Sequence, residues 1–349
     1  MFKRLIITLA LLGLGYTIYA QIEGKSGPLL SPGLTEKIQT TLSLATPQPT
    51  PFYEVTIPYL RERSYVSQLE DQKKVTSNAS YTSYLTSYQS DGLKINGLLT
   101  KPQGDMPSGG WPAIVFVHGY IAPSIYRTTE RYVAYVDYLA KQGFVVFKID
   151  LRGHGDSEGD PSGAYYSSDY IIDVLNARSA LQNSNFVNPQ KVGLWGHSMA
   201  GNVTFRALAT TKDIPAVAIW AGAVYTYQDF GEYGISDNSY RPAPTDSPSR
   251  QKRAEMLNLY GQFSPENPFW RQVAPTNYLE GVATAIQLHH AENDEVVPIE
   301  YSRNLVSVLD KTKIPHELYT YNSGGHNIDG ASFNLAMHRT AEFFTKYLK

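Results

Sequence analysis

Short apolar runs alternate with helical stretches along the chain, and this alternation constrains the fold more than any other feature. The runs have little polar alternation, which is typical of strands buried on both faces of a sheet. They are AIVFVHG (113–119), FVVFKID (144–150), KVGLWG (191–196), PAVAIWAG (215–222), TAIQLHHA (284–291) and HELYTYN (316–322). Segments with helical period separate or follow them, at 131–143, 170–183, 200–210, 299–310 and 330–349. The pattern predicts an α/β fold, a mostly parallel sheet with helices on both faces.

Two segments depart from this rhythm. Tyr81–Gln89 and Leu93–Lys101 are joined by Ser90-Asp91-Gly92, which predicts an antiparallel hairpin before the parallel strands. Residues 223–283 are too long for an ordinary connection between two core strands. We therefore expect an inserted lid there, with a helix near 251–261.

The N-terminal sequence predicts that the protein is located outside the cytoplasm. Lys3 and Arg4 precede an apolar run over 5–20, which as a helix would span about 24 Å, short of the roughly 30 Å hydrocarbon core. Residues 1–22 are therefore expected to be a signal peptide or a short membrane anchor, with the remainder exported. The proline-rich residues 23–51 are interpreted as a linker to a catalytic domain over 52–349.

Composition and charge limit the kinds of ligand that the chain is expected to bind. The formal net charge is −2, which argues against nucleic-acid binding, and the chain contains no cysteine for disulfides or thiolate metal sites. His289 and His290 end one apolar run, but no further ligands stand near them in the sequence, so we interpret both as structural. No cofactor or metal is predicted. Nothing in the sequence indicates an oligomeric state.

One serine stands at a sharp corner between a strand and a helix. Gly196-His197-Ser198-Met199-Ala200 approximates the G-x-S-x-G pattern, in which a strained turn lifts a serine hydroxyl above the sheet. Small flanking residues are needed because strand and helix approach closely there. Ala200 departs from the pattern by one methyl group, and Gly201 follows it. The N-terminus of the next helix would favour an oxyanion beside the serine.

A serine hydroxyl is a weak nucleophile and needs a base, which itself needs a carboxylate to orient it. His326 lies between the last strand and the last helix, and Asp294 follows a buried strand. The order Ser198, Asp294, His326 is that of the α/β-hydrolase triad. Glu292 and Glu295 are the alternative acids, and Asp294 is preferred because its context leads into the next helix.

The oxyanion should be held by two backbone N–H groups. Met199 follows the nucleophile and is the first donor. The loop after the strand at 113–119 should supply the second, and we assign it to Tyr120. His118, in the same loop, is interpreted as a structural residue bonded to loop backbone.

Taken together, HGY, DLRGHGDSEG, GHSMAG, ENDEVVP and GGHN resemble the α/β-hydrolase superfamily, specifically the catalytic domain of prolyl-oligopeptidase (S9) peptidases, over residues 81–349. The resemblance implies the triad Ser198, Asp294 and His326, and a structural turn at 150–157. Family members carry an N-terminal β-propeller that screens peptide size, and residues 52–80 are too few for one. Access control would then fall to the lid and to residues 52–65.

The predicted function is hydrolysis of peptide or related acyl bonds in small substrates through an acyl-enzyme on Ser198. DLRGHGDSEG also resembles a loop of cinnamoyl and feruloyl esterases, so a carboxylesterase with the same triad is the alternative. Aromatic residues of the lid would suit such a substrate or form the lid's own core: Phe230, Tyr233, Phe263, Phe269 and Trp270. A non-catalytic binding module on the same fold is the alternative from another class.

Overall fold

A nine-stranded sheet organises the computed structural model, which describes residues 50–161 and 164–349. The predicted export segment 1–22 and most of the predicted linker 23–51 lie outside the described residues. The strand order is β1-β2-β3-β5-β4-β6-β7-β8-β9. The strands are β1 Lys73–Ser77, β2 Tyr81–Ser90, β3 Leu93–Pro102, β4 Trp111–Val117, β5 Val145–Ile149, β6 Val187–His197, β7 Ala216–Trp220, β8 Ala285–Ala291 and β9 His316–Tyr321.

Strands β4 to β9 pair in parallel, as the unbroken apolar runs predict, and β1 to β3 extend the sheet by antiparallel pairing. The predicted hairpin is β2 and β3. Its turn contains only Asp91 and Gly92, at φ 52° and 77°, and Ser90 still pairs with Leu93. Two successive positive φ angles give the twist that two-residue hairpins favour. Strand β1 was not predicted, because its five residues are all exposed and show no apolar alternation.

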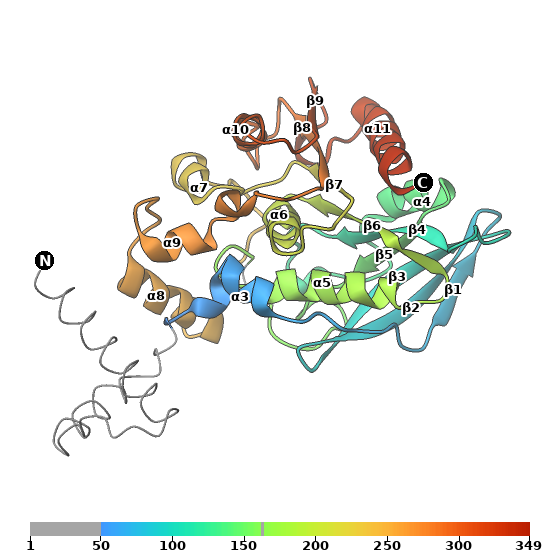
Figure 1. Cartoon of the computed structure of the whole chain (residues 1–349), viewed down its shortest axis with the longest axis horizontal. Helices are drawn as coiled ribbons and strands as arrows, with labels where there is room; N and C mark the ends of the chain where they lie inside the picture. The colour runs from blue at the N-terminus through green and yellow to red at the C-terminus, as the bar shows by residue number, and fades with distance from the viewer. Residues whose placement is uncertain (1–49, 162–163) are drawn as a thin grey trace, which may run out of the picture. The chain divides into compact units, whose positions relative to one another are not determined.

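Helices cover both faces of the sheet (Figure 1). Helices α5 and α6 pack on one face, and α4 and α11 pack on the other. Alternate strand residues point to opposite faces of the sheet and pack in two hydrophobic cores. Leu194 and Val217 belong to the first core, while Trp195 and Trp220 belong to the second. The helices are α3 Ile57–Glu62, α4 Val133–Lys141, α5 Asp169–Gln182, α6 Ala200–Thr210, α7 Tyr227–Tyr233, α8 Pro248–Tyr260, α9 Pro268–Val273, α10 Glu300–Leu309 and α11 Ala331–Leu348. None of the helices within the described ranges is long and apolar enough to cross a membrane.

The segment before the sheet forms the short helix α3. The Thr56 hydroxyl accepts the Tyr59 N–H at its start, and Pro58 occupies its first turn. Arg61 then donates to the carbonyl oxygen of Ala209, at 2.6 Å from Nη2. Ala209 is in the last turn of α6, so this segment lies at the far end of α6 from Ser198.

Between β7 and β8 the insertion folds into α7, α8 and α9. Phe269 and Trp270 of α9 are buried in the same hydrophobic core as α5 and α6, so they anchor the insertion to the domain. Phe230 and Phe263 instead line a cavity of about 380 Å³ together with Tyr166. The interpretation as substrate-facing residues therefore stays a prediction for Phe230 and Phe263 alone.

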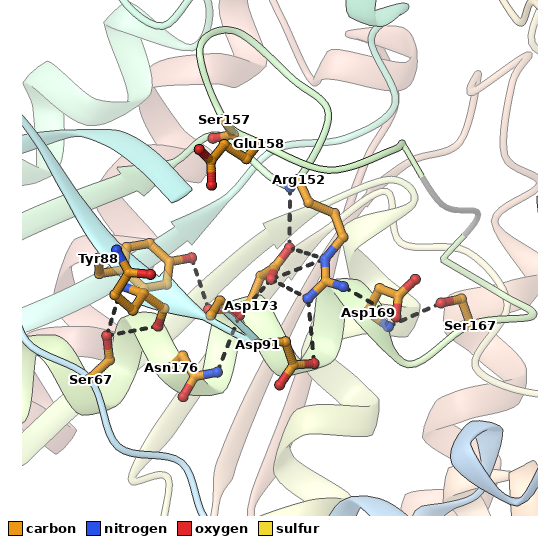
Figure 2. A network of polar contacts seen from close by, with 12 residues as sticks. Ser67, Tyr88, Asp91, Arg152, Ser157, Glu158, Ser167, Asp169, Asp173 and Asn176 are labelled. Carbon is orange, nitrogen blue, oxygen red and sulfur yellow. Dashed lines mark hydrogen bonds and ion pairs between the residues drawn. The ribbon is translucent and has the colours of Figure 1, made fainter. Parts of the chain in front are cut away.

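The loop after β5 ties three parts of the fold together (Figure 2). Arg152 is 7% exposed, and its guanidinium donates to both carboxylate oxygens of Asp173 on α5, which is fully buried. Ser90, at the end of β2, donates to the same carboxylate at 2.7 Å. Asp169 lies 3.3 Å from the other guanidinium nitrogen. This network holds the hairpin, the loop and α5 against one another, in agreement with the structural turn predicted for this loop.

Candidate active site

Ser198 occupies the corner between β6 and α6 that the sequence predicts. Its φ is 57°, a left-handed conformation that is rare for a residue other than glycine. Backbone bonds hold the turn: the Ser198 N–H donates to the carbonyl oxygen of Trp220 at 2.9 Å, and its carbonyl accepts from Gly201 and Ala223. A strained φ held by neighbouring strands is typical of a functional position.

The close approach at this corner explains which neighbours must be glycine. A Cβ at Gly196 would lie 2.9 Å from the carbonyl oxygen of Ala200, and a Cβ at Gly201 would lie 2.7 Å from Cα of Gly222. Such distances are shorter than packed atoms allow. Ala200 itself is fully buried within α6. The departure from G-x-S-x-G is therefore accommodated, because Gly201 is the residue that faces the neighbouring strand end.

Three side chains from three loops form one hydrogen-bonded chain. Ser198 Oγ lies 2.8 Å from His326 Nε2, and His326 Nδ1 lies 2.9 Å from Asp294 Oδ2. A carboxylate can only accept, so Nδ1 carries the proton and Nε2 is free to accept from the serine hydroxyl. The structure thus brings together the serine, histidine and aspartate that the sequence singles out.

The alternative acids do not reach the histidine. Glu292 is exposed and pairs with Arg303 on α10, with 2.7 Å between Oε2 and Nη2. Glu295 is also exposed. The Asp294 side chain is buried at the acid position.

Asp294 is held as an anion by its surroundings. Burial alone would raise its pKa, but hydrogen bonds from His290 and His326 outweigh it and hold the pKa well below its usual range. The N–H groups of Val296 and Val297 donate to Oδ1 at 2.8 Å and 3.0 Å. A fixed negative charge is thereby placed against the ring of His326.

The loop that carries His326 depends on two glycines. Gly324 and Gly325 have φ of 120° and 56°, and a Cβ at Gly324 would lie 2.9 Å from backbone atoms of Ile328. The Gly325 N–H donates to the side-chain oxygen of Asn293 at 3.0 Å, which ties this loop to the one that carries Asp294. The GGHN sequence therefore sets the position of the base relative to the acid.

The loop after β4 lies directly against the serine turn. A Cβ at Gly119 would come within 3.1 Å of the carbonyl oxygen of His197, the residue before Ser198. Within residues 50–161 and 164–349, the N–H groups of Met199 and Tyr120 have no acceptor. Both predicted oxyanion donors thus remain available beside the serine. Both ring nitrogens of His118 contact loop backbone, at Gly119 and Leu151.

His197 and Tyr132 connect the loop after β4, the serine turn and the loop that carries His326. Neither residue was predicted to belong to the site. The Tyr132 hydroxyl accepts the Gly119 N–H at 3.0 Å and lies 2.8 Å from His197 Nδ1. His197 Nε2 lies 2.8 Å from the carbonyl oxygen of His326. Burial lowers the pKa of His197 to about 3, so the ring is neutral. The only sequence signal was a histidine directly before the nucleophile.

The insertion contacts the site at two points. The Ser236 N–H donates to the carbonyl oxygen of Val296 at 2.9 Å, beside the acid loop. The Arg241 N–H donates to the Tyr120 hydroxyl at 3.0 Å, on the loop after β4. In the strand order, β6 and its serine turn stand between these loops. Residues 236–241 therefore connect the two sides of the site, and we name them the strap.

The site holds no cluster suited to a metal. Among the residues that the structure describes, no group of three or more His, Asp or Glu side chains could bind a metal ion. His289 contacts Tyr321 and Gln287 through its ring nitrogens, and these partners lie away from the serine. The chain from Ser198 through His326 to Asp294 can supply proton transfer and nucleophilic attack by a serine hydroxyl.

A sequence model of the prolyl oligopeptidase family matches residues 131–349. An uncharacterized peptidase, YuxL of Bacillus subtilis (strain 168), is 25% identical over 243 residues, which cover 68% of this chain and 34% of that protein. Human dipeptidyl peptidase 8 is 26% identical over 245 residues, covering 68% of this chain and 25% of its own. The chain thus spans about a third of the first relative and a quarter of the second.

Solved structures agree on the fold. Acetyl xylan esterase 1 from Thermoanaerobacterium superposes with a TM-score of 0.60 at 17% identity, over 87% of this chain and 96% of the esterase. At this identity the likeness concerns the architecture alone. The sheet and helices are those of the α/β-hydrolase fold, as the sequence predicts.

Proposed function

We propose that this chain, which belongs to the prolyl oligopeptidase family, hydrolyses short peptides through an acyl-enzyme on Ser198. The chain is a hydrolase of the α/β class, and the proposal adds the nucleophile and the substrate. The observation that carries it is the continuous chain from Ser198 Oγ through His326 to Asp294, with contacts of 2.8 Å and 2.9 Å. Nucleophile, base and orienting carboxylate are within hydrogen-bond reach of one another.

In the proposed reaction the Ser198 oxygen attacks the substrate carbonyl carbon while His326 Nε2 takes the hydroxyl proton. The imidazolium that forms is stabilised by the Asp294 carboxylate. His326 then gives its proton to the leaving amine as the carbonyl–nitrogen bond breaks. Water attacks the resulting ester by the same route, and the free acid and Ser198 are released.

Charge develops on the carbonyl oxygen during both attacks. The N–H groups of Met199 and Tyr120 are the proposed donors to it, supported by their position on either side of the serine turn and by their lack of an acceptor within residues 50–161 and 164–349. A single donor of this kind contributes about 3 kcal/mol to transition-state stabilisation in serine hydrolases.

The strap favours small substrates. Because Ser236 and Arg241 bond to loops on either side of Ser198, a folded protein chain would have to displace these contacts to reach the serine. A short peptide needs less room. This supports short peptides over intact proteins as substrates.

An ester of an aromatic acid is the second candidate. A cavity of about 380 Å³ beside α7 is lined by four aromatic side chains, one cation and smaller or amide residues: Tyr166, Tyr227, Phe230, Phe263, Arg253, Gln228, Gly231, Gln262 and Pro265. Aromatic walls would pack against an aromatic acid, and Arg253 could contact a polar substituent. The serine chemistry would be unchanged.

The test is kcat/KM for the full chain and its Ser198→Ala variant on aminoacyl and prolyl p-nitroanilides, and on p-nitrophenyl and feruloyl esters. Anilide cleavage that falls by several orders of magnitude in Ser198→Ala supports the peptidase. Serine-dependent cleavage of esters alone would favour the second candidate. No turnover, with Ser198 also inert to a fluorophosphonate, would contradict both and favour a binding module.

A further inference from the structure

Asp294 has a second imidazole against it besides that of His326. His290 Nε2 lies 3.2 Å from Asp294 Oδ2, the same oxygen that His326 Nδ1 contacts at 2.9 Å. The side chains of His290 and Asp294 are both fully buried. From the sequence alone only a structural role is predicted for His290, and nothing in its spacing links it to Ser198.

The hydrogen-bond geometry determines which His290 nitrogen carries a proton. Nε2 also lies 2.9 Å from the carbonyl oxygen of Val297. Both partners of Nε2 can only accept, so Nε2 carries the hydrogen. Nδ1 lies 2.8 Å from the Ser302 hydroxyl on α10, which can donate to it. The neutral ring therefore has both nitrogens satisfied, and α10 fixes its orientation.

With His290 in place, both oxygens of the Asp294 carboxylate face N–H donors. Oδ1 accepts from the N–H groups of Val296 and Val297, and Oδ2 accepts from His326 and shares the His290 Nε2–H with the carbonyl oxygen of Val297, which is the nearer acceptor. A buried carboxylate with an unfilled position could rotate toward another donor, whereas a saturated network fixes one orientation. His290 thus restrains the oxygen on which His326 depends.

We infer that His290 is a positioning residue, which holds Asp294 Oδ2 in line with His326 and acts on the serine only through that carboxylate. The inference rests on the proposed function, because it assigns His290 a role in the same reaction. It extends the site by one layer, from Asp294 to His290 and Ser302. His290 touches no reacting atom.

The adjacent residue offers a matched control. His289 is as buried as His290 and is next to it on β8, so its side chain points to the opposite face of the sheet. Its partners are Tyr321, Gln287 and Thr340, none of which belongs to the serine, histidine and aspartate chain. Replacing either histidine removes a buried imidazole from the same strand, but only one replacement touches Asp294.

The experiment compares kcat and KM of the full chain with those of His290→Leu, His290→Gln and His289→Leu, using the best substrate of the panel above. A misplaced catalytic group typically costs about 100-fold, so His290→Leu should lower kcat by about that factor with KM little changed. His290→Gln keeps an N–H donor and should recover most of the loss. His289→Leu should retain the wild-type kcat per folded molecule.

A double-mutant cycle separates positioning from general damage. If His290 acts through Asp294, His290→Leu should lower kcat much less in an Asp294→Asn background than in the wild type. An equal factor in both backgrounds, or equal losses for His289→Leu and His290→Leu, would overturn the inference. If His290→Leu does not fold, Ser302→Ala carries the test: kcat should fall several-fold, and an unchanged kcat would overturn it.

A spectroscopic readout keeps this inference distinct from the proposed function. The His326 Nδ1–H, bonded to a buried carboxylate, should give a low-field proton resonance, identified by its loss in His326→Gln. We expect His290→Leu to shift or abolish it and His289→Leu to retain it. Absence of all hydrolysis would refute the proposed function alone, and the resonance would then decide: an unchanged signal in His290→Leu would overturn the positioning role.

Discussion

Two buried aspartates, Asp294 and Asp173, have equally inaccessible side chains and several hydrogen-bond donors each, but their partners differ in kind. Asp173 is bound by the guanidinium of Arg152, which keeps its protons under all ordinary conditions. Asp294 is bound by imidazoles, each of which has a second ring nitrogen that can accept a hydrogen bond. Burial and several donors therefore do not by themselves identify the carboxylate of the proposed triad. What distinguishes Asp294 is that one of its donors, His326, faces Ser198 with its other nitrogen.

The largest effect should follow from removing the charge of Asp294. In Asp294→Asn the amide can face His326 with its NH₂ group, which favours the wrong tautomer, and kcat should fall by about 10⁴-fold. Unfolding by urea should show a folded protein. Glu292→Gln is the matched control and should leave kcat unchanged. A severe loss in Glu292→Gln instead would refute the assignment of the acid.

Removing Asp173 should produce the opposite profile. Asp173→Ala leaves Arg152 buried without its main partner, and breaking a buried pair costs about 3 to 5 kcal/mol of unfolding free energy. We expect the lower end, because Asp169 remains 3.3 Å from the guanidinium. The kcat per folded molecule should stay close to that of the wild type. A loss of kcat without a loss of stability would break the distinction between the two aspartates.

A smaller loss of stability is expected from removing one hydrogen-bond donor to Asp173. Ser90→Ala removes the 2.7 Å hydrogen bond to the carboxylate and should lower the free energy of unfolding by about 2 kcal/mol. Urea unfolding curves would measure it, with kcat as the readout that should not move. An effect as large as that of Asp173→Ala would mean that the serine, and not the arginine, dominates the network.

The dependence of folding stability on pH should show whether the pKa of Asp294 is lowered in the folded protein. The pKa of Asp294 is lowered in the folded state, so its contribution to stability is full above about pH 4, the unfolded value, and is lost as the pH falls. Below about pH 4 the wild type should lose about 1.4 kcal/mol per pH unit more than Asp294→Asn. Urea unfolding from pH 7 to pH 3 would measure the difference. Parallel curves over the whole range would contradict the lowered pKa.

Much of the fold follows from local sequence patterns. The apolar runs and helical periods predict the parallel strands and their helices because each pattern is contained within one element. Helix α3 was missed although Thr56 and Pro58 are ordinary start signals. Strand β1 has no such signal, because its five residues are all exposed.

In the site, Ser198, Asp294 and His326 could be predicted because each stands in a recognisable loop. His290, His197 and Tyr132 could not, since their roles depend on contacts between segments distant in the chain. Tyr132 precedes His197 by 65 residues and Ser302 follows His290 by 12. A histidine at the end of an apolar run gives the same pattern whether its ring faces a carboxylate or a tyrosine.

The strap also has a consequence for the timing of substrate entry. It is held by neutral hydrogen bonds of Ser236 to Val296 and of Arg241 to Tyr120, and by the edge-on packing of the Tyr240 ring against that of Tyr120. Neutral hydrogen bonds contribute only about 1 kcal/mol each, so we expect the strap to be detached in a minor population of molecules. A substrate too large to pass beneath it can bind only that minor population, and its apparent affinity is lowered by the same fraction. Discrimination by substrate size would then depend on how often the strap opens and not on fixed dimensions of the site.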